Sequence, residues 1–125
     1  MEIHQSAEDY LEAILMIKEK KGYVRSVDVA NHLSVSRPSV SYSMKRLREN
    51  DYITINEDGM IYLTDKGSAI AEKIYLRHRV LTCIFKSIGV SEKVAEEDAC
   101  MVEHNLSDET FDALLKYAEK HKLDL

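Results

Sequence analysis

The sequence is poor in the residues that interrupt or cross-link regular structure. Its 125 residues include four glycines, one proline, two cysteines and no tryptophan. So little glycine and proline disfavours a turn-rich β fold and favours a mainly helical one. The two cysteines, Cys83 and Cys100, are too few for a disulfide framework. The length suits one compact unit or two very small ones and leaves little room for a large catalytic domain.

Targeting signals are also missing. No apolar run approaches the roughly 18 residues needed to cross a membrane, and the N-terminus has no basic segment followed by an apolar one. We therefore expect a soluble, cytoplasmic protein with reduced thiols and no membrane partner. The net charge of −5, from 22 acidic and 17 basic side chains, argues mildly against nucleic-acid binding through overall charge.

Apolar residues at helical spacing predict three helices in the first half of the chain. The first covers residues 8–20 with Ser6 as its N-cap, and the second begins at a Ser26 cap. The third starts at Arg37-Pro38-Ser39, where proline is tolerated in a first helical turn, and ends near residues 49–50. The short polar turn between the second and third helices is typical of a helix-turn-helix.

The segment that follows has a different pattern. Residues 52–56 and 60–64 are rich in β-branched and aromatic side chains and flank an Asp58-Gly59 turn, which predicts a β-hairpin. A hairpin directly after a helix-turn-helix is the layout of a winged helix. Three further helices are predicted: a long one from a Thr64 cap to Gly89, one from Ser91 to Asn105, and one capped by Ser107.

Basic residues are concentrated on the third predicted helix, which has no acidic residue until Glu49. Its short hydroxyl groups can approach phosphates or base edges when the helix N-terminus enters a major groove. A solvated face without a DNA partner is the alternative for an isolated basic helix. Because one such unit offers few contacts, we expect a homodimer on double-stranded operator DNA. The residues expected to contact DNA are Arg37, Pro38, Ser39, Ser41, Tyr42, Lys45 and Arg46.

A second cluster lies near the end of the fifth predicted helix. Cys100, Glu103 and His104 follow an i, i+3, i+4 spacing, which places them on about one helical face. A thiolate, a carboxylate and an imidazole can share a divalent ion of Fe, Mn, Co, Ni or Zn, whereas sulfur disfavours Mg and Ca. The alternative is a structural cysteine beside a surface Glu-His pair. Three ligands on one helix leave the coordination sphere incomplete, and the candidates to fill it are Asp9, Glu12 and His78.

Taken in order, these motifs resemble the diphtheria-toxin-repressor and manganese-transport-regulator (DtxR/MntR) family of bacterial metalloregulators. The resemblance covers essentially the whole chain. It is carried by the 6–12 segment, the winged helix, the 77–81 segment and the Cys-x-x-Glu-His-x-x-Ser run from Cys100 to Ser107. It implies a homodimeric, metal-activated transcriptional repressor of metal-uptake genes. The chain ends at Leu125 and thus resembles the short form without an SH3-like domain.

The resemblance also implies an organisation. We expect a mainly α protein with an N-terminal winged helix-turn-helix and β-hairpin wing over residues 1–70. An all-helical metal-binding and dimerisation domain follows over residues 71–125. The dimer would form through apolar faces of the last two helices, which carry Met101, Val102, Phe111, Leu114 and Leu115.

For the metal, the resemblance implies a mixed ligand set. Asp9, His78, Glu103 and His104 match ligand positions of the family, and Glu12 matches the second first-helix carboxylate of manganese-type members. Cys100 matches the cysteine of the iron-type branch, where the manganese branch has a carboxylate. Asp9, in contrast, stands where the iron-type branch has methionine. We therefore expect Mn(II) or Fe(II), with Co(II), Ni(II), Zn(II) or Cd(II) as substitutes in vitro.

A second metal position of the iron type is disfavoured. Thr82 and Glu96 stand where the iron-type branch has an ancillary carboxylate and histidine. A manganese-type neighbouring site built from Glu12, His78 and a bridging Cys100 or Glu103 stays open, as does a role for Glu96.

Three other functions compete with this one. The first is a metal-independent winged-helix regulator. The second is an enzyme with Cys100 as nucleophile and His104 as base, or a zinc hydrolase. One helical turn between the two groups is a poor geometry for that chemistry, and no oxyanion loop or glycine-rich phosphate cradle is visible. The third, a protein-interaction module, leaves the basic helix unexplained. We expect neither catalysis nor a small-molecule substrate.

Overall fold

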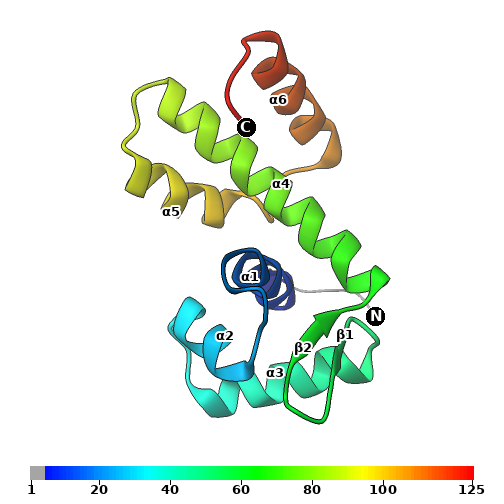
Figure 1. Ribbon diagram of the computed structural model, residues 1–125. Coiled ribbons are helices and arrows are strands. Elements are labelled where there is room, and N and C mark those ends of the chain that lie inside the picture. Colours follow the sequence, from blue (N-terminus) through cyan, green and yellow to red (C-terminus); the bar gives the residue numbers. More distant parts are fainter. Residues whose placement is uncertain (1–4) are drawn as a thin grey trace. The chain divides into compact units, whose positions relative to one another are not determined.

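The computed structural model describes residues 5–125, which form six α-helices and one two-stranded antiparallel sheet (Figure 1). The mainly α fold with a hairpin wing is confirmed. None of the helices in the described range is long and apolar enough to cross a membrane. In chain order the elements are α1 (Gln5–Lys21), α2 (Ser26–Leu33), α3 (Arg37–Glu49), β1 (Ile53–Ile55), β2 (Ile61–Leu63), α4 (Asp65–Ser87), α5 (Glu92–Val102) and α6 (Asp108–Lys120).

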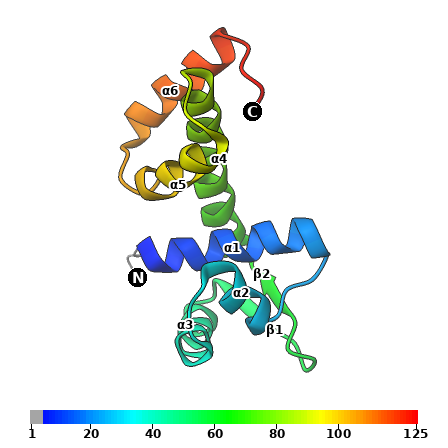
Figure 2. The ribbon, with the colours of Figure 1, turned by 90° about the vertical axis from the view of Figure 1, so that its left-hand side faces the viewer.

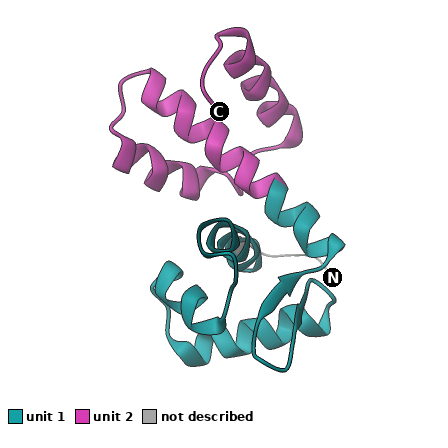
Figure 3. Ribbon diagram, in the orientation of Figure 1, with its two compact units in different colours: residues 1–72 teal, residues 73–125 magenta. Residues whose placement is uncertain are grey.

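The chain divides into two compact units within α4 (Figure 3). The first unit covers residues 1–72 and the second covers residues 73–125. The divide predicted from the sequence lies in the same helix, two residues earlier, after Ile70. Each unit has its own apolar core.

The first unit packs its three helices and the hairpin around one core. Figure 2 shows α1 with α2, α3 and the two strands beside it. Leu11 and Ile14 of α1, Val29 of α2, Val40 of α3 and Ile53 of β1 are almost completely buried. Burial of each such side chain contributes about 1.5–3 kcal/mol, so this core fixes how α3 is presented.

Capping residues set where the helices of the first unit begin. Ser36 caps α3, and its hydroxyl oxygen accepts a hydrogen bond from the Ser39 backbone N–H at 3.3 Å. The predicted cap at Ser26 is wrong because Ser26 is already helical. The N-cap position falls on Arg25, whose backbone N–H donates to the Asp28 carboxylate at 2.9 Å. Ser6 also lies inside its helix, since α1 extends back to Gln5.

The hairpin pairs Ile53 with Leu63 and Ile55 with Ile61. Its turn is closed by the Asn56 side chain, whose Oδ1 accepts from the backbone N–H groups of residues 58 and 60 at 3.0 and 2.9 Å. Gly59 has a φ of +80°, a conformation that favours glycine. The predicted Asp58-Gly59 hairpin is therefore confirmed.

The start of α4 is fixed against the wing. Thr64 accepts a hydrogen bond from the Gly67 N–H at 3.1 Å, as its predicted capping role requires. A Cβ atom on Gly67 would overlap the carbonyl oxygen of Tyr52. Only glycine permits so close an approach, and this contact joins the beginning of α4 to the end of the helix-turn-helix.

In the second unit, α4 and α6 enclose a smaller core. Val80 and Ile84 of α4 pack with Phe111 and Ala118 of α6. Ser107 caps α6, with its hydroxyl oxygen accepting from the Thr110 N–H at 3.2 Å. Phe111 is only 6% exposed and belongs to the core of its own unit. It is therefore not available for the dimer contact expected from the sequence.

Candidate metal centre

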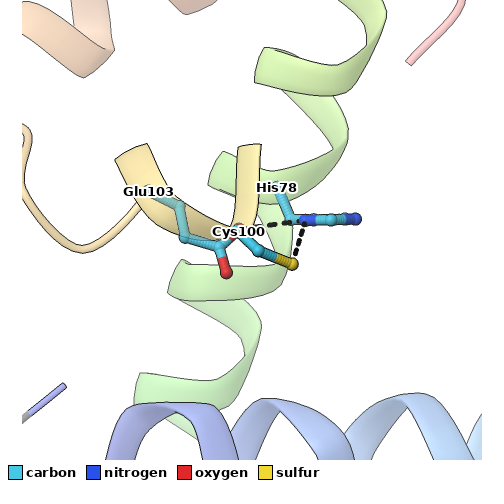
Figure 4. Close-up of side chains that lie close together, drawn as sticks. All are labelled: His78, Cys100 and Glu103. Carbon is cyan, nitrogen blue, oxygen red and sulfur yellow. Dashed lines mark hydrogen bonds and ion pairs between the residues drawn. The ribbon is translucent and has the colours of Figure 1, made fainter. Parts of the chain in front are cut away.

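Three side chains with metal-binding atoms meet in the second unit (Figure 4). His78 comes from α4, while Cys100 and Glu103 come from the end of α5. The His78 Nδ1 atom lies 3.0 Å from Glu103 Oε2 and 3.7 Å from Cys100 Sγ. One donor atom from each residue falls within 4.8 Å of the other two. The structure thus brings together three of the six predicted metal ligands.

Helical geometry accounts for the pairing of Cys100 with Glu103. The helix α5 ends at Val102, earlier than the predicted end at Asn105. Glu103 nevertheless keeps helical backbone angles, and its N–H donates to the Ala99 carbonyl oxygen at 2.9 Å. The i, i+3 relation between Cys100 and Glu103 is therefore preserved, and both reach toward α4.

His104 lies in the turn after α5, beside Glu103. Its Nε2 atom is 3.4 Å from Glu103 Oε1, and its side chain is almost completely buried. The carboxylate of Glu103 thus has an imidazole on each side, His78 at Oε2 and His104 at Oε1. All four ligand positions predicted in the second unit are close together along this chain of contacts.

The Glu103 carboxylate has none of its surface exposed. Its Oε1 oxygen accepts no hydrogen bond among the described residues. A buried carboxylate in this condition is costly unless a positive group neutralises it. Together with a thiol and two imidazoles, it forms a nitrogen, oxygen and sulfur donor set that fits a divalent transition metal.

The same surroundings act on the proton of His78. Hydrogen bonds to Cys100 and Glu103 raise the pKa of His78 from its ordinary value of 6.5 to about 10, against the lowering effect of burial. The protonated imidazole supplies a positive charge next to the buried carboxylate. A metal ion that takes a ring nitrogen of His78 must displace that proton.

The turn that carries Glu103 and His104 is held by a residue to which the sequence analysis gives no ligand role. Arg77 is 4% exposed and directly precedes His78. Its Nη1 donates to the carbonyl oxygens of Glu103 at 3.1 Å and Leu106 at 2.7 Å. Its Nη2 donates to the Asp108 carboxylate at 2.7 Å. The available sequence signal is an arginine beside the predicted ligand His78.

The other predicted metal residues lie elsewhere in the chain. Asp9 and Glu12 are one turn apart on α1, in the first unit. Their membership of the metal site stays a prediction. Glu96 is exposed on α5, and the Thr82 hydroxyl of α4 has no hydrogen-bond partner among the described residues.

The predicted DNA-binding residues share the exposed surface of α3 in the first unit. All seven are exposed, whereas Val40, Met44 and Leu47 of the same helix are buried. Tyr42 is 62% exposed, and its hydroxyl accepts a hydrogen bond from Arg46 at 3.0 Å. Arg37 and Ser41 line a small pocket with Ser26, at the beginning of α2.

Two family models together match nearly the whole chain. The model of the iron-dependent repressor N-terminal DNA-binding domain matches residues 2–60, and that of the metal-binding and dimerisation domain matches residues 64–124. The transcriptional regulator MntR of Salmonella typhimurium is 34% identical over 114 residues, which are 91% of this chain and 73% of that protein.

Two solved structures give the same result. The manganese regulator SloR has a TM-score of 0.78 and 28% identity, covering 95% of this chain and 55% of that one. The metal-dependent transcriptional regulator MtsR has a TM-score of 0.79 and 30% identity, covering 90% of this chain and 53% of that one. The chain thus spans about half the length of these two structures.

A winged helix with a basic helix, and a cluster of thiol, imidazole and carboxylate groups, define a DNA-binding regulator that responds to metal. The chain belongs to the iron-dependent repressor family, the DtxR/MntR family that its motifs resemble. It is a metal-dependent transcriptional repressor, and a metal-independent regulator is not favoured. Membership of a family of transcriptional regulators implies a regulator and not an enzyme.

The raised pKa of His78 predicts that metal and protons compete for this site. The metal-free imidazole of His78 has a pKa of about 10 and is therefore protonated between pH 6 and 9. Apparent metal affinity should rise with pH over that range. Each displaced proton gives about a tenfold change per pH unit, and a thiolate ligand at Cys100 adds its own proton to that of His78. Imidazole NMR of the metal-free protein and Co(II) titrations at several pH values measure the two quantities. A His78 ring that titrates near 6.5 would contradict this prediction.

Proposed function

We propose that the protein is a homodimeric repressor whose binding to operator DNA is activated by Mn(II) or Fe(II). The observation that carries the proposal is the convergence of His78, Cys100 and Glu103 around a carboxylate that has no exposed surface. Such a set of donors in a chain of this family suits a resident divalent ion. The cytoplasm, where thiols stay reduced, is the proposed location.

We infer that six residues hold the ion or ions. His78, Cys100, Glu103 and His104 come from the second unit, and Asp9 and Glu12 come from α1 of the first. When bound, the ion supplies positive charge that neutralises these carboxylates and the thiolate. Because the proposed ligands come from two separate units, ligation of one ion by both would select one arrangement of the DNA-binding unit.

The required energy is modest. A preference of about 1–3 kcal/mol for the DNA-competent arrangement changes DNA affinity about 5- to 150-fold. The ligands on α1 and α5 need only bias an existing equilibrium, since the fold of each unit rests on its own apolar core. The switch therefore depends on carboxylates and imidazoles, which can be replaced without removing core side chains.

The first test removes one ligand at a time. Glu103→Ala or His104→Ala should abolish the stimulation of DNA binding by Mn(II) while the protein stays folded. The matched control is Glu97→Ala, which removes an exposed carboxylate from α5 and should leave the stimulation intact. Electrophoretic mobility shifts with and without Mn(II) measure the effect. Metal-dependent shifts that are unchanged in both ligand variants would refute the assignment.

The choice of metal is proposed to depend on Cys100. A thiolate is a softer donor than a carboxylate and favours metals later in the series than Mn(II). The variant Cys100→Glu should therefore shift the preference toward Mn(II) relative to Fe(II), Co(II) and Zn(II). Anaerobic DNA-binding titrations across these four ions measure the order of preference, with Cys83→Ser as the control for general loss of a thiol. An unchanged order would exclude Cys100 as the determinant.

DNA is proposed to meet the exposed surface of α3. The buried face of α3 is fixed in the core, so Arg37, Tyr42 and Arg46 are presented from a rigid helix. In the first helical turn Pro38 has no N–H and the Ser39 N–H is bound by the Ser36 hydroxyl, so contact with a phosphate there is assigned to the Arg37 side chain. Hydroxyl and guanidinium groups further along can reach base edges in a major groove.

Loss of one phosphate contact gives a quantitative expectation. Arg37→Ala should weaken binding to operator and unrelated DNA alike and reduce the slope of log affinity against log salt by about 1. Lys116→Ala, on the exposed surface of α6, is the charge-matched control. Fluorescence anisotropy over a range of salt concentrations measures both quantities. A salt slope equal to that of the unmodified protein would show that Arg37 makes no phosphate contact.

Dimerisation is proposed for the second unit, whose family model is a metal-binding and dimerisation domain. Ile88 and Met101 are 68% and 63% exposed, and Val94 is 43% exposed. Exposed apolar side chains on α5 and on the loop before it suit an interface between copies. Phe111, which was expected in the dimer interface, is left out of this proposed interface because it is buried in its own unit.

A further inference from the structure

We infer that Arg77 is a positioning residue for the metal centre, a role that rests on the proposed metal-dependent function. Arg77 and His78 are neighbours on α4, yet they act on the site in different ways. His78 faces the Cys100 and Glu103 side chains. Arg77 instead binds the backbone of the turn from which Glu103 and His104 project.

The contacts of Arg77 hold that turn at three points. The guanidinium donates to the carbonyl oxygens of Glu103 and Leu106 and to the Asp108 carboxylate, which is in the first turn of α6. Carbonyl groups at a helix end lack intrahelical partners and need donors from elsewhere. The planar fork of arginine can reach all three acceptors at once, whereas the ammonium of lysine is a compact point charge.

Packing holds the guanidinium itself in place. Its Cζ atom lies 5.3 Å from the centre of the Phe111 ring, and Phe111 belongs to the apolar core between α4 and α6. Arg77 is therefore fixed by the core on one side and fixes the ligand-bearing turn on the other. The spacing between His78 on α4 and Glu103 after α5 follows from these contacts.

The positive charge of Arg77 by itself weakens the binding of a metal cation, whereas its positioning of the turn strengthens that binding. A positive group beside the ligands disfavours a second positive group by Coulomb repulsion. If charge were the dominant effect of Arg77, its removal would tighten metal binding. If positioning is dominant, its removal loosens metal binding. The sign of the change therefore distinguishes the two roles.

The experiment compares Arg77→Met and Arg77→Lys with the unmodified full-length chain, with Co(II) as the probe. Both variants should weaken Co(II) affinity by about 10- to 100-fold, as is typical when the residues that orient metal ligands are lost. The thiolate-to-Co(II) absorption band should also change, because Glu103 no longer has a fixed position relative to Cys100. Lys73→Met is the control, since Lys73 also pairs with Asp108, at 3.1 Å, without contacting the turn.

Several outcomes would overturn the inference. Co(II) affinity in Arg77→Met equal to or tighter than that of the unmodified chain would show that positioning is not dominant. Full affinity and an unchanged band in Arg77→Lys would show that the three contacts of the guanidinium are not needed to position the turn. If Arg77→Met fails to fold in thermal unfolding of the metal-free protein, Arg77→Lys decides alone. Failure of the proposed function is a separate result, in which Glu103→Ala binds Co(II) as tightly as the unmodified chain does.

Discussion

Glu103 carries a carboxylate that has no contact with solvent, and the second unit is arranged around that constraint. A charge in such a place must have partners of opposite charge or good hydrogen bonds. The protonated imidazole of His78 supplies one at 3.0 Å, and His104 lies at the other oxygen. Arg77 holds the backbone of the same residue. A proton on His78 and a metal ion would thus each neutralise the Glu103 carboxylate, so the two cations compete at this site.

Because the chain divides into two units, the proposed metal centre can act on a DNA-binding unit that has its own core. Each unit has a separate core, so neither depends on the metal centre for its apolar packing. The α3 surface proposed to meet DNA is held by Val40, Met44 and Leu47 from within the first unit. The four proposed ligands of the second unit are held by α4, α5 and the turn after α5. Communication between the units is then assigned to Asp9 and Glu12, the two proposed ligands on α1.

Much of this organisation could be predicted from the sequence because it depends on local patterns. Apolar residues at helical spacing predicted α3, which buries Val40, Met44 and Leu47, and Asp58-Gly59 predicted the hairpin turn. The i, i+3 spacing of Cys100 and Glu103 predicted that they share a helical face. Helix starts were less certain: a cap at Ser26 was wrong because Asp28 binds the backbone of Arg25 instead. Serine, aspartate and arginine near a helix start offer competing hydrogen bonds that sequence does not rank.

The features that sequence could not supply are contacts between segments distant in the chain. Arg77 lies 26 residues from Glu103, and nothing in its local pattern indicates that it binds that carbonyl group. Phe111 has the apolar character of an interface residue, yet the core between α4 and α6 buries it. The basic character of α3, in contrast, could be predicted from the positions of its residues, although the net charge of the chain is −5.

The central claim is that metal binding and DNA binding are linked. Calorimetric titration of Mn(II) into the free protein and into its operator complex tests it most directly. The account predicts that DNA tightens Mn(II) binding about 5- to 150-fold, by the same factor by which Mn(II) tightens DNA binding. Equal Mn(II) affinities with and without DNA would contradict it.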